Sequence, residues 1–298
     1  MIDVLCIGHA SFDITMNAPH HPGSDEKMLA NAMHLCGGGP AANAAVQVAR
    51  LGGKAAFCGY LGNDIFGETH WRELQDEGVD TSAVVRGDTP TPVSQIIAKP
   101  DATRSVVNFK ADTPWLLANA VDTSLLDKLA PRVVLFDGHE PLISEPICHR
   151  AKQHHIPTLL DAGSLHRGTQ NLCKQVDYML ASETFARQRN PTSDVAAALA
   201  DFANIAPHAL ITLGARGLLW AKNGETGELA AFAVDAIDST GAGDAFHGAF
   251  ALALARAMPW PDVLRFASAA GALACTQLGA RIALADSIAV QQLLAATP

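Results

Sequence analysis

A glycine-rich stretch near residue 240 combines small residues with a carboxylate. It lies between an apolar segment, residues 229–234, and an alanine-rich segment, residues 245–257. The first segment predicts a strand and the second a helix, so the glycines form a turn that opens a helix. Such a turn lets the backbone come close to a ligand, and its free N–H groups at the positive end of the helix dipole favour an anion. The residues of this turn are Gly241, Ala242, Gly243 and Asp244.

A carboxylate beside an anion site suggests a base. Asp244 would repel a phosphate if the turn did nothing but bind one. It could instead accept the proton of a hydroxyl that attacks a phosphoryl group, while the N–H groups of the turn stabilise the charge that develops. An aspartate that only caps a helix is about as common for so short a pattern. The short pattern therefore leaves both interpretations open.

The longer stretch around Asp244 favours the chemical interpretation. Residues 238–249 read Asp-Ser-Thr-Gly-Ala-Gly-Asp-Ala-Phe-His-Gly-Ala. This string resembles the signature of the ribokinase, or phosphofructokinase-B (PfkB), family of carbohydrate kinases. The resemblance covers essentially the whole chain and looks closest to the sulfofructose kinase and ketohexokinase-like members. It implies an ATP- and Mg²⁺-dependent kinase acting on a small sugar, with Asp244 as the general base and Gly241, Ala242 and Gly243 in the anion hole.

Composition excludes several other classes of protein. The chain has 298 residues, 49% hydrophobic and 17% charged, which is enough for a large core. A net charge of −9 argues against a nucleic-acid surface. The six cysteines are scattered and no signal peptide is visible, so we expect reduced thiols in a cytoplasmic protein. No apolar run reaches membrane-spanning length, and the histidines show no metal-binding spacing.

Strand-like and helix-like segments alternate along most of the chain. This alternation predicts a single α/β domain over residues 1–298, with a mostly parallel sheet and helices on both faces. Two polar or irregular pieces at about 14–35 and 84–112 interrupt it, and the second resembles a β-hairpin with edge strands. The resemblance makes this fold ribokinase-like and makes the two pieces a small β lid over the substrate, through which homodimers form. The strands are expected at 4–7, 55–58, 133–136, 157–161, 177–181 and 209–212.

Candidate sugar-binding residues follow the first strand and open the first helix. Asp13 comes just after the strand at 4–7, where ligands of open α/β sheets bind, although a carboxylate in an ordinary turn is the simpler interpretation. A glycine turn then leads into an alanine-rich helix. It fits a loose dinucleotide fingerprint, but the next strand does not end in an acidic residue, so NAD is disfavoured. The resemblance assigns the sugar to Asp13, Lys27, Gly38, Gly39, Asn43, Asn108 and His139.

A second set of residues is expected to bind the nucleotide. A glycine loop follows the strand at 209–212, and a helix of small residues covers 265–275. An arginine in such a loop could pair with phosphates or simply be exposed. The small side chains could leave room for adenine or permit close helix packing. The resemblance assigns the nucleotide site to Ser182, Thr212, Gly214, Arg216, Gly217, Thr240 and Ala272.

The chain departs from the family pattern at three points. Ribokinases carry Asn-x-x-Glu where this chain begins with Ser182 and ends with Phe185, so magnesium ordering through water is assigned to the adjacent Glu183. Ala283 replaces a serine that often lies near the potassium site, which weakens the case for K⁺ activation. His139 falls where sulfofructose kinase places a sulfonate-facing arginine, which favours an unphosphorylated ketose or a related sugar.

Other functions remain open at this stage. A nucleoside kinase of the same fold would stack aromatic side chains on the base, but the chain is only 6% aromatic, with Phe109 and Trp115 near the lid. A non-catalytic sugar-binding protein would not need Asp244 and the glycines. A dehydrogenase is the weakest alternative. P-loop kinases and protein kinases are disfavoured because their phosphate-binding and catalytic motifs do not occur.

Overall fold

An eight-stranded sheet forms the centre of the protein. The structure is a computed structural model, and it describes residues 1–99, 103–111 and 121–297. The strand order is β14-β13-β12-β11-β10-β9-β1-β4. The six strands from β12 to β4 run parallel, while β13 and β14 are antiparallel, as predicted for a mostly parallel sheet. The strands are β1 (Val4–Ile7), β4 (Ala55–Cys58), β9 (Val133–Phe136), β10 (Thr158–Ala162), β11 (Tyr178–Ser182), β12 (His208–Thr212), β13 (Leu218–Lys222) and β14 (Glu225–Leu229).

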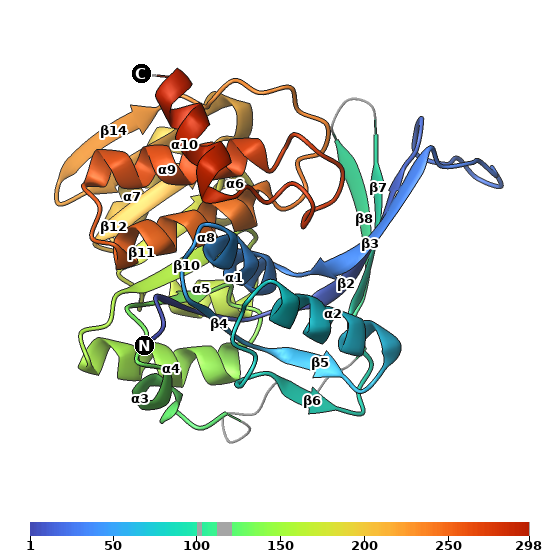
Figure 1. The fold of residues 1–298 in the computed structure, drawn as a ribbon. Helices are drawn as coiled ribbons and strands as arrows, with labels where there is room; N and C mark the ends of the chain where they lie inside the picture. Colours follow the sequence, from blue (N-terminus) through green and yellow to red (C-terminus); the bar gives the residue numbers. More distant parts are fainter. Residues whose placement is uncertain (100–102, 112–120, 298) are drawn as a thin grey trace.

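Helices cover both faces of this sheet (Figure 1). The buried strands are apolar on both sides: Val4 and Cys6 join one hydrophobic cluster, and Leu5 and Ile7 join the other. The first cluster is completed by α1 (Pro40–Arg50), α8 (Ala242–Ala255), α9 (Trp260–Leu273) and α10 (Ser287–Ala296). The second is completed by α3 (Leu125–Leu129), α4 (Pro141–Gln153), α5 (Arg167–Leu172), α6 (Glu183–Arg189) and α7 (Val195–Ala203). None of the helices in the described ranges is long and apolar enough to cross a membrane.

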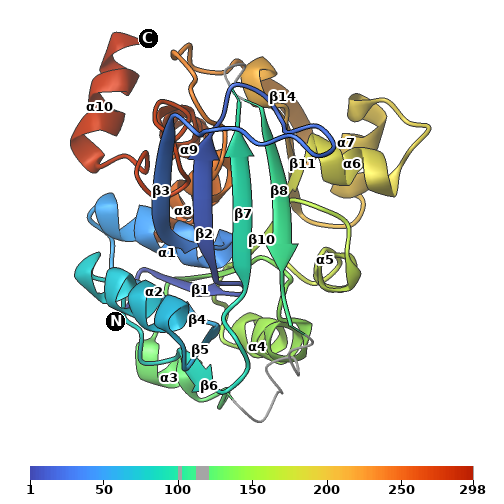
Figure 2. The same cartoon turned by 90° about the vertical axis from the view of Figure 1, so that its right-hand side faces the viewer.

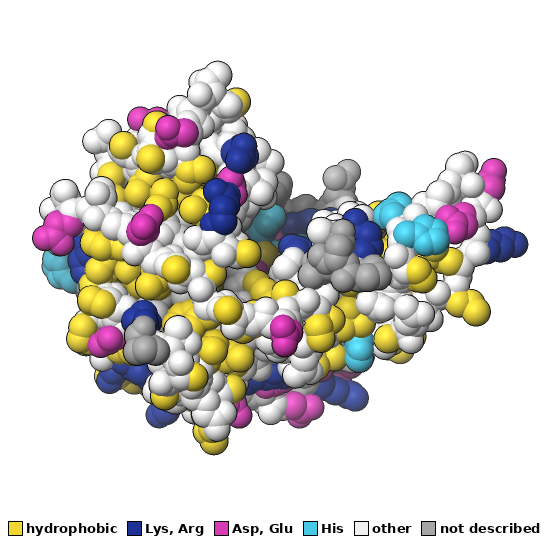
Figure 3. All heavy atoms as spheres, turned by 90° about the horizontal axis from the view of Figure 1, so that it is seen from above, with side chains coloured by type: hydrophobic (Ala, Val, Ile, Leu, Met, Phe, Trp, Pro, Cys, Tyr) yellow, Lys and Arg dark blue, Asp and Glu magenta, His cyan; other side chains and the backbone are white. Residues whose placement is uncertain are grey.

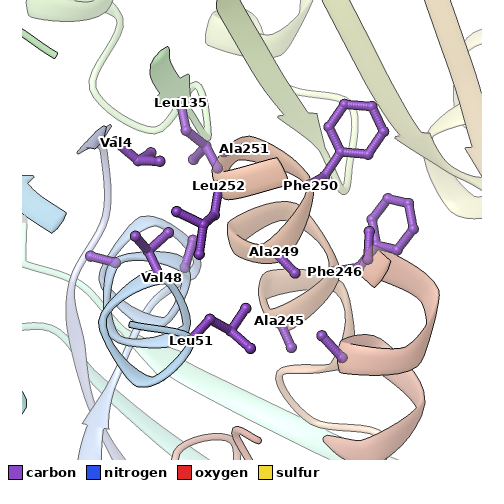
Figure 4. Close-up of a cluster of buried hydrophobic side chains, with 14 of the residues drawn as sticks. Val4, Val48, Leu51, Leu135, Ala245, Phe246, Ala249, Phe250, Ala251 and Leu252 are labelled. Carbon is purple, nitrogen blue, oxygen red and sulfur yellow. The ribbon is translucent and has the colours of Figure 1, made fainter. Parts of the chain in front are cut away.

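The contact between α1 and α8 positions the site. Both helices are rich in alanine, and Val48, Leu51 and Leu252 pack between them (Figure 4). A Cβ atom at Gly248 would lie 2.5 Å from the carbonyl oxygen of Ala44, so the two backbones approach too closely for any larger residue there. Each helix begins just after a glycine. Their close contact therefore brings the first turn of α1 next to the first turn of α8.

A four-stranded sheet projects from the main body as a lid (Figure 1), and Figure 2 shows this sheet face-on. Its order is β3-β2-β7-β8, which confirms a β structure in both predicted insertions. Two details of the prediction are wrong. Asp13 lies within β2 rather than in a loop, and β7 is an internal strand because it pairs with both β2 and β8. The lid strands are β2 (Ser11–Asn17), β3 (Ala32–Gly38), β7 (Val93–Ala98) and β8 (Arg104–Phe109).

A small unit of two strands and one helix packs beside the lid. β5 (Tyr60–Gly62) pairs with β6 (Val85–Gly87), and α2 (Ile65–Asp76) contacts both β5 and β3. The Asp64 side chain caps α2 by accepting the N–H of Gly67.

Two further boundaries differ from the sequence prediction. The apolar residues 229–234 do not form a strand, since β14 ends at Leu229 and residues 230–237 belong to no strand. Phe232 is buried against the core, so its hydrophobic pattern reflects packing of an irregular segment. The glycine turn before α1 is shorter than expected, because β3 continues to Gly38 and only Gly39, at φ 95°, makes the turn.

Candidate active site

Asp244 stands in the first turn of α8, beside unpaired backbone N–H groups. Gly241 caps the helix in the left-handed conformation, at φ 80°, which favours glycine. Within the described ranges, the N–H groups of Gly241, Gly243 and Asp244 have no hydrogen-bond partner. They lie at the positive end of the helix dipole, where an anion is stabilised. The predicted helix-opening turn is confirmed, although the helix begins at Ala242 rather than at 245.

Asp238 holds this turn in place. One oxygen of its buried carboxylate accepts the backbone N–H of Thr240 at 2.9 Å and the Thr240 hydroxyl at 2.6 Å. The other oxygen accepts the N–H of Gly279 at 2.9 Å, which ties the turn to the segment between α9 and α10. The Thr240 hydroxyl, assigned to the nucleotide by sequence, therefore serves first to shape residues 238–244, the signature loop.

The predicted sugar-binding residues meet Asp244 at the start of α1. The Asn43 amide nitrogen donates to Oδ2 of Asp244 at 2.7 Å, and Asn43 is only 2% exposed. Asp13 is buried nearby and accepts the Ser11 hydroxyl at 2.8 Å. A Cβ atom at Gly38 would lie 2.2 Å from the Asp13 carboxylate, so the glycine makes room for this side chain. Oδ1 of Asp244 has no partner within the described ranges and can take a proton.

Burial raises the pKa of Asp244 to about 6, and the nearby carboxylate of Asp161 adds to the rise. The Asn43 hydrogen bond and the charge of His247 oppose it. Nδ1 of His247 lies 3.0 Å from Oδ2 of Asp161, and both side chains are almost fully buried. Burial alone would lower the pKa of His247, but the carboxylates of Asp161 and Asp244 raise it overall. Asp244 thus titrates close to neutral pH, as suits a general base.

Sequence reasoning missed the pair of Asp161 and His247. Asp161 lies at the end of β10, and His247 lies three residues after Asp244 on α8. That spacing puts His247 and Asp244 on one face of the helix, which is the signal that could have identified it.

His139 belongs to a cluster of imidazoles beside the site. Its ring stacks on His166 at a centroid distance of 4.4 Å and approaches His9 at 5.3 Å. The buried carboxylate of Asp137 accepts the backbone N–H groups of His9 and His139, at 2.7 and 2.9 Å. Burial lowers the pKa of His9, and it lowers the pKa of His166 to about 4. Those two rings are therefore neutral at pH 7 and present hydrogen-bonding, uncharged edges.

The predicted nucleotide residues meet at the ends of β11 and β12. Ser182 and Thr212 are direct neighbours in the sheet register. The Ser182 hydroxyl caps α6 by accepting the N–H of Phe185 at 3.0 Å. Arg216 forms an ion pair with Glu183, which also pairs with Arg187 at 2.6 Å. Gly217, at φ 87°, makes the loop possible because a Cβ atom there would lie 2.0 Å from the carbonyl oxygen of Leu229.

Glu183 is poorly arranged for ordering magnesium. Each of its two oxygens contacts an arginine, and these hydrogen bonds lower the pKa of the carboxyl. No group of three or more His, Cys, Asp or Glu side chains in the described part of the chain could hold a metal ion. The protein therefore offers no metal cage of its own there. The geometry gives no support to the role that sequence reasoning assigned to Glu183.

Several predicted residues lie outside these contacts. Lys27 is exposed in the loop between β2 and β3, and Asn108 is exposed on β8. Gly214 is exposed at φ 59° with open space around it. Ala272 lies in α9, where a Cβ atom on the adjacent Gly271 would come within 3.1 Å of the carbonyl oxygen of Ala242. The small residues of α9 therefore permit close packing against the start of α8.

The lid also reaches the signature loop, which sequence reasoning did not foresee. Nη1 of Arg104, the first residue of β8, donates to the Ser239 hydroxyl at 2.8 Å. Arg104 is exposed, and its contact places a cation at Ser239, two residues before the unpaired N–H group of Gly241. A notch separates the main body from the lid in the view of Figure 3. The candidate site is thus bordered by the signature loop, the first turn of α1 and the lid.

Comparisons with known proteins bear on the family and the fold of this chain. The model of the pfkB family carbohydrate kinases matches residues 1–287. Ribokinase of Bacillus subtilis (strain 168) is 28% identical over 305 residues, which cover 99% of this chain and 100% of the relative. Ribokinase from Thermotoga maritima superposes with a TM-score of 0.86 at 23% identity, covering 99% of this chain and 100% of that one. Arabidopsis thaliana ribokinase complexed with ribose and ATP gives a TM-score of 0.85 at 25% identity, with 98% of each chain covered.

Proposed function

Since this chain belongs to the pfkB family of carbohydrate kinases, we propose that it transfers the γ-phosphoryl group of Mg·ATP to a hydroxyl of a small sugar. Asp244 is the general base in this proposal. One observation carries it: a carboxyl with a pKa of about 6 keeps one oxygen unpaired beside unpaired N–H groups at a helix N-terminus. That arrangement places a proton acceptor next to an anion site.

The proposed reaction follows from these groups. The sugar hydroxyl approaches Oδ1 of Asp244 and loses its proton to it as the oxygen attacks the γ-phosphorus. The bond between that phosphorus and the bridging oxygen of ADP then breaks, and the N–H groups of residues 241–244 stabilise the phosphoryl oxygens. Arg104 adds a positive charge from the lid. Closure of the lid excludes water, which would otherwise accept the phosphoryl group.

Magnesium enters this scheme as part of the nucleotide substrate. Mg²⁺ commonly binds through substrate phosphates and retained waters, with few protein ligands. The absence of a three-residue metal cluster in the described residues fits that mode, and it supports no dedicated protein site. We therefore assign no proton-transfer or positioning step to a protein-bound metal. The case against activation by K⁺, made from Ala283, still rests on the sequence alone.

An uncharged sugar fits the acceptor side of the site best. Asp13 and Asn43 are buried there and can bind hydroxyls, and the pKa of His9 and of His166 keeps those two rings neutral at pH 7. A phosphorylated or sulfonated sugar would face Asp13 and Asp244 without a matched arginine among the residues assigned to it. Ribose is the first candidate because the Bacillus subtilis relative is a ribokinase, and an unphosphorylated ketose is the second.

The lid also carries a surface suited to a homodimer. The strand register places Asp13, Ser94 and Asn108 on one face of the lid sheet. The opposite face carries Leu35 and Val107, which are 53% and 68% exposed. An exposed apolar sheet face of this kind favours association. The chain would pair through this face, with the polar face turned toward the sugar.

Sedimentation velocity tests the dimer. Val107→Lys should shift the protein from dimer to monomer, because a buried ammonium would be unpaired in the interface. Ile288→Lys, at a 66% exposed position on α10, is the matched control and should leave the dimer intact. A monomeric unmodified protein at micromolar concentration would contradict the proposal.

Substrate identity is tested by ADP release from Mg·ATP over a panel of acceptors. Ribose, fructose, tagatose, fructose 6-phosphate, sulfofructose and adenosine cover the open alternatives. We expect one neutral sugar to stimulate ADP release at least 100-fold over the acceptor-free rate, with the sugar phosphate recovered as product. Preference for fructose 6-phosphate or sulfofructose would refute the uncharged acceptor, and adenosine would indicate a nucleoside kinase. ATP binding without turnover on any acceptor would favour a sugar-binding role.

A further inference from the structure

A buried arginine lies behind the proposed base. Arg281 belongs to the segment between α9 and α10 and is only 4% exposed. Its nearest carboxylate oxygen, Oε2 of Glu73, is 3.9 Å from Nη1, and Nη1 has no hydrogen-bond partner in the described part of the chain. Burial lowers the pKa of the guanidinium, although it stays charged at pH 7. Burying a cation without a close counter-ion costs stability, so the arrangement is not explained by folding alone.

The guanidinium concentrates its hydrogen bonds on one amide. Nε and Nη2 of Arg281 both donate to Oδ1 of Asn43, at 3.2 and 3.0 Å. Nη2 also lies 3.2 Å from Nε2 of His70. Burial and the charge of Arg281 lower the pKa of His70, so its ring is neutral and accepts from the guanidinium. Two of the three guanidinium nitrogens thus donate hydrogen bonds to the same oxygen of Asn43.

These two hydrogen bonds fix the orientation of the Asn43 amide. With Oδ1 on the guanidinium, Nδ2 points to Oδ2 of Asp244 at 2.7 Å. A flipped amide would set its oxygen against the Asp244 carboxylate and its N–H groups against Arg281, and both contacts would be repulsive. Arg281 therefore selects the orientation in which Asn43 donates to Asp244. Oδ2 is then occupied, and Oδ1 is the oxygen left for the sugar hydroxyl.

We propose that Arg281 is a positioning residue for the phosphoryl transfer: it orients the Asn43 amide, which holds Asp244 with Oδ1 toward the acceptor. The inference rests on the proposed function, because it explains how Asp244, the proposed base, is oriented toward the acceptor. Arg281 is only 4% exposed, so we expect it to act through Asn43 rather than by touching the nucleotide or the sugar. Its effect should therefore depend on Asn43 and should appear in kcat more than in the KM for Mg·ATP.

Arg50 provides a matched control. It also holds the segment between α9 and α10, donating to the carbonyl oxygens of Arg281 and Leu284 at 2.9 and 2.8 Å. It pairs with Glu77 and has no contact with Asn43. Arg50→Gln loosens the same segment without removing the guanidinium from the amide. A role of Arg281 limited to anchoring this segment would give Arg50→Gln and Arg281→Met the same kinetic defect.

The test is a double-mutant cycle on kcat with the best acceptor of the panel. We expect Arg281→Met to lower kcat by 10- to 100-fold, with the KM for Mg·ATP changed less than threefold. Arg281→Gln, whose amide can still donate to Asn43, should recover part of the loss. In an Asn43→Ala background, Arg281→Met should have no further effect, because the two residues act in series. Urea unfolding of each variant distinguishes a loss of folded protein from a loss of the correct orientation of Asp244.

Specific results would overturn the inference. Multiplicative losses in kcat for Arg281→Met and Asn43→Ala would mean that Arg281 does not act through Asn43. An equal defect in Arg50→Gln would reduce Arg281 to a structural anchor. If Arg281→Met fails to fold, Arg281→Gln and Arg281→Lys carry the cycle in its place. Asp244→Asn distinguishes failure of this inference from failure of the proposed function. Full turnover in Asp244→Asn would show that Asp244 is not the base. An inactive Asp244→Asn protein, together with multiplicative losses for Arg281→Met and Asn43→Ala, would exclude only the role of Arg281.

Discussion

Asp244→Asn should stabilise the folded protein at alkaline pH while it abolishes turnover. The folded structure raises the pKa of Asp244 from an ordinary 3.8 to about 6, first through burial and then through Asp161. The folded protein thus binds this proton more tightly than the unfolded chain does. Ionisation of Asp244 therefore costs stability at every pH above the folded value, and the cost fades as pH falls toward 3.8.

The magnitude follows from the size of the shift. One pKa unit corresponds to about 1.4 kcal/mol, so the ionised carboxylate costs roughly 3 kcal/mol at pH 8. At pH 4 the two states bind nearly the same number of protons, and the cost falls below about 1 kcal/mol. Asparagine keeps an oxygen that can accept the Asn43 amide, but it removes a negative charge from beside His247. We therefore expect a net gain of about 2–3 kcal/mol at pH 8.

Urea unfolding at pH 8 and pH 4, with equal m-values, measures this difference. The thermal midpoint at pH 8 should rise by about 4–6 °C, at about 2 °C per kcal/mol for a chain of this size. The same titration governs the unmodified enzyme, whose kcat/KM should halve near pH 6 and fall tenfold per unit below it. An Asp244→Asn protein that is no more stable than the unmodified protein at pH 8, or equally stabilised at both pH values, would refute the reasoning.

Three further substitutions test the surroundings of the base. His247→Gln removes the imidazolium that opposes the rise in the pKa of Asp244, so the acid limb of the kcat/KM profile should move to higher pH; an unmoved limb would exclude the charge effect. Gly248→Ala inserts a methyl group 2.5 Å from the Ala44 carbonyl oxygen, so α1 and α8 must separate. Urea unfolding should show that the free energy of unfolding falls by about 1–3 kcal/mol, and kcat should fall as well. A stable, fully active variant would mean that their spacing is not critical. Arg104→Gln should lower kcat at least tenfold with folding unchanged by circular dichroism, because the lid then brings no charge to the phosphates; unaltered kinetics would confine Arg104 to its contact with Ser239.

The main sheet could be predicted from sequence because its strands are buried on both faces. Apolar runs such as residues 4–7 and 133–136 are typical of strands in a parallel sheet with both faces covered, and both form strands at the predicted positions. The same reasoning failed at residues 229–234. Burial of Phe232 produces an apolar pattern there without any strand pairing, and a pattern of hydrophobicity alone does not distinguish the two cases.

The base and its glycine turn could also be predicted, since they are contiguous in the chain. The groups that tune and aim Asp244 could not, because the fold brings them from distant segments. Asn43 lies 201 residues before Asp244 in the chain, Arg281 follows it only after α8 and α9, and Asp161 arrives on β10. The assignment of Glu183 to magnesium did not consider Arg187, four residues later on α6, or Arg216, which reaches Glu183 only because the loop after β12 lies beside α6.

The most direct test of the central claim compares turnover with nucleotide binding in Asp244→Asn. Isothermal titration gives the Kd for Mg·ATP, and ADP release with the best acceptor gives kcat for the same preparation. If Asp244 is the base, kcat should fall at least 1000-fold while the Kd changes less than threefold, because the unpaired N–H groups of α8 remain. Turnover within tenfold of the unmodified enzyme would contradict the claim.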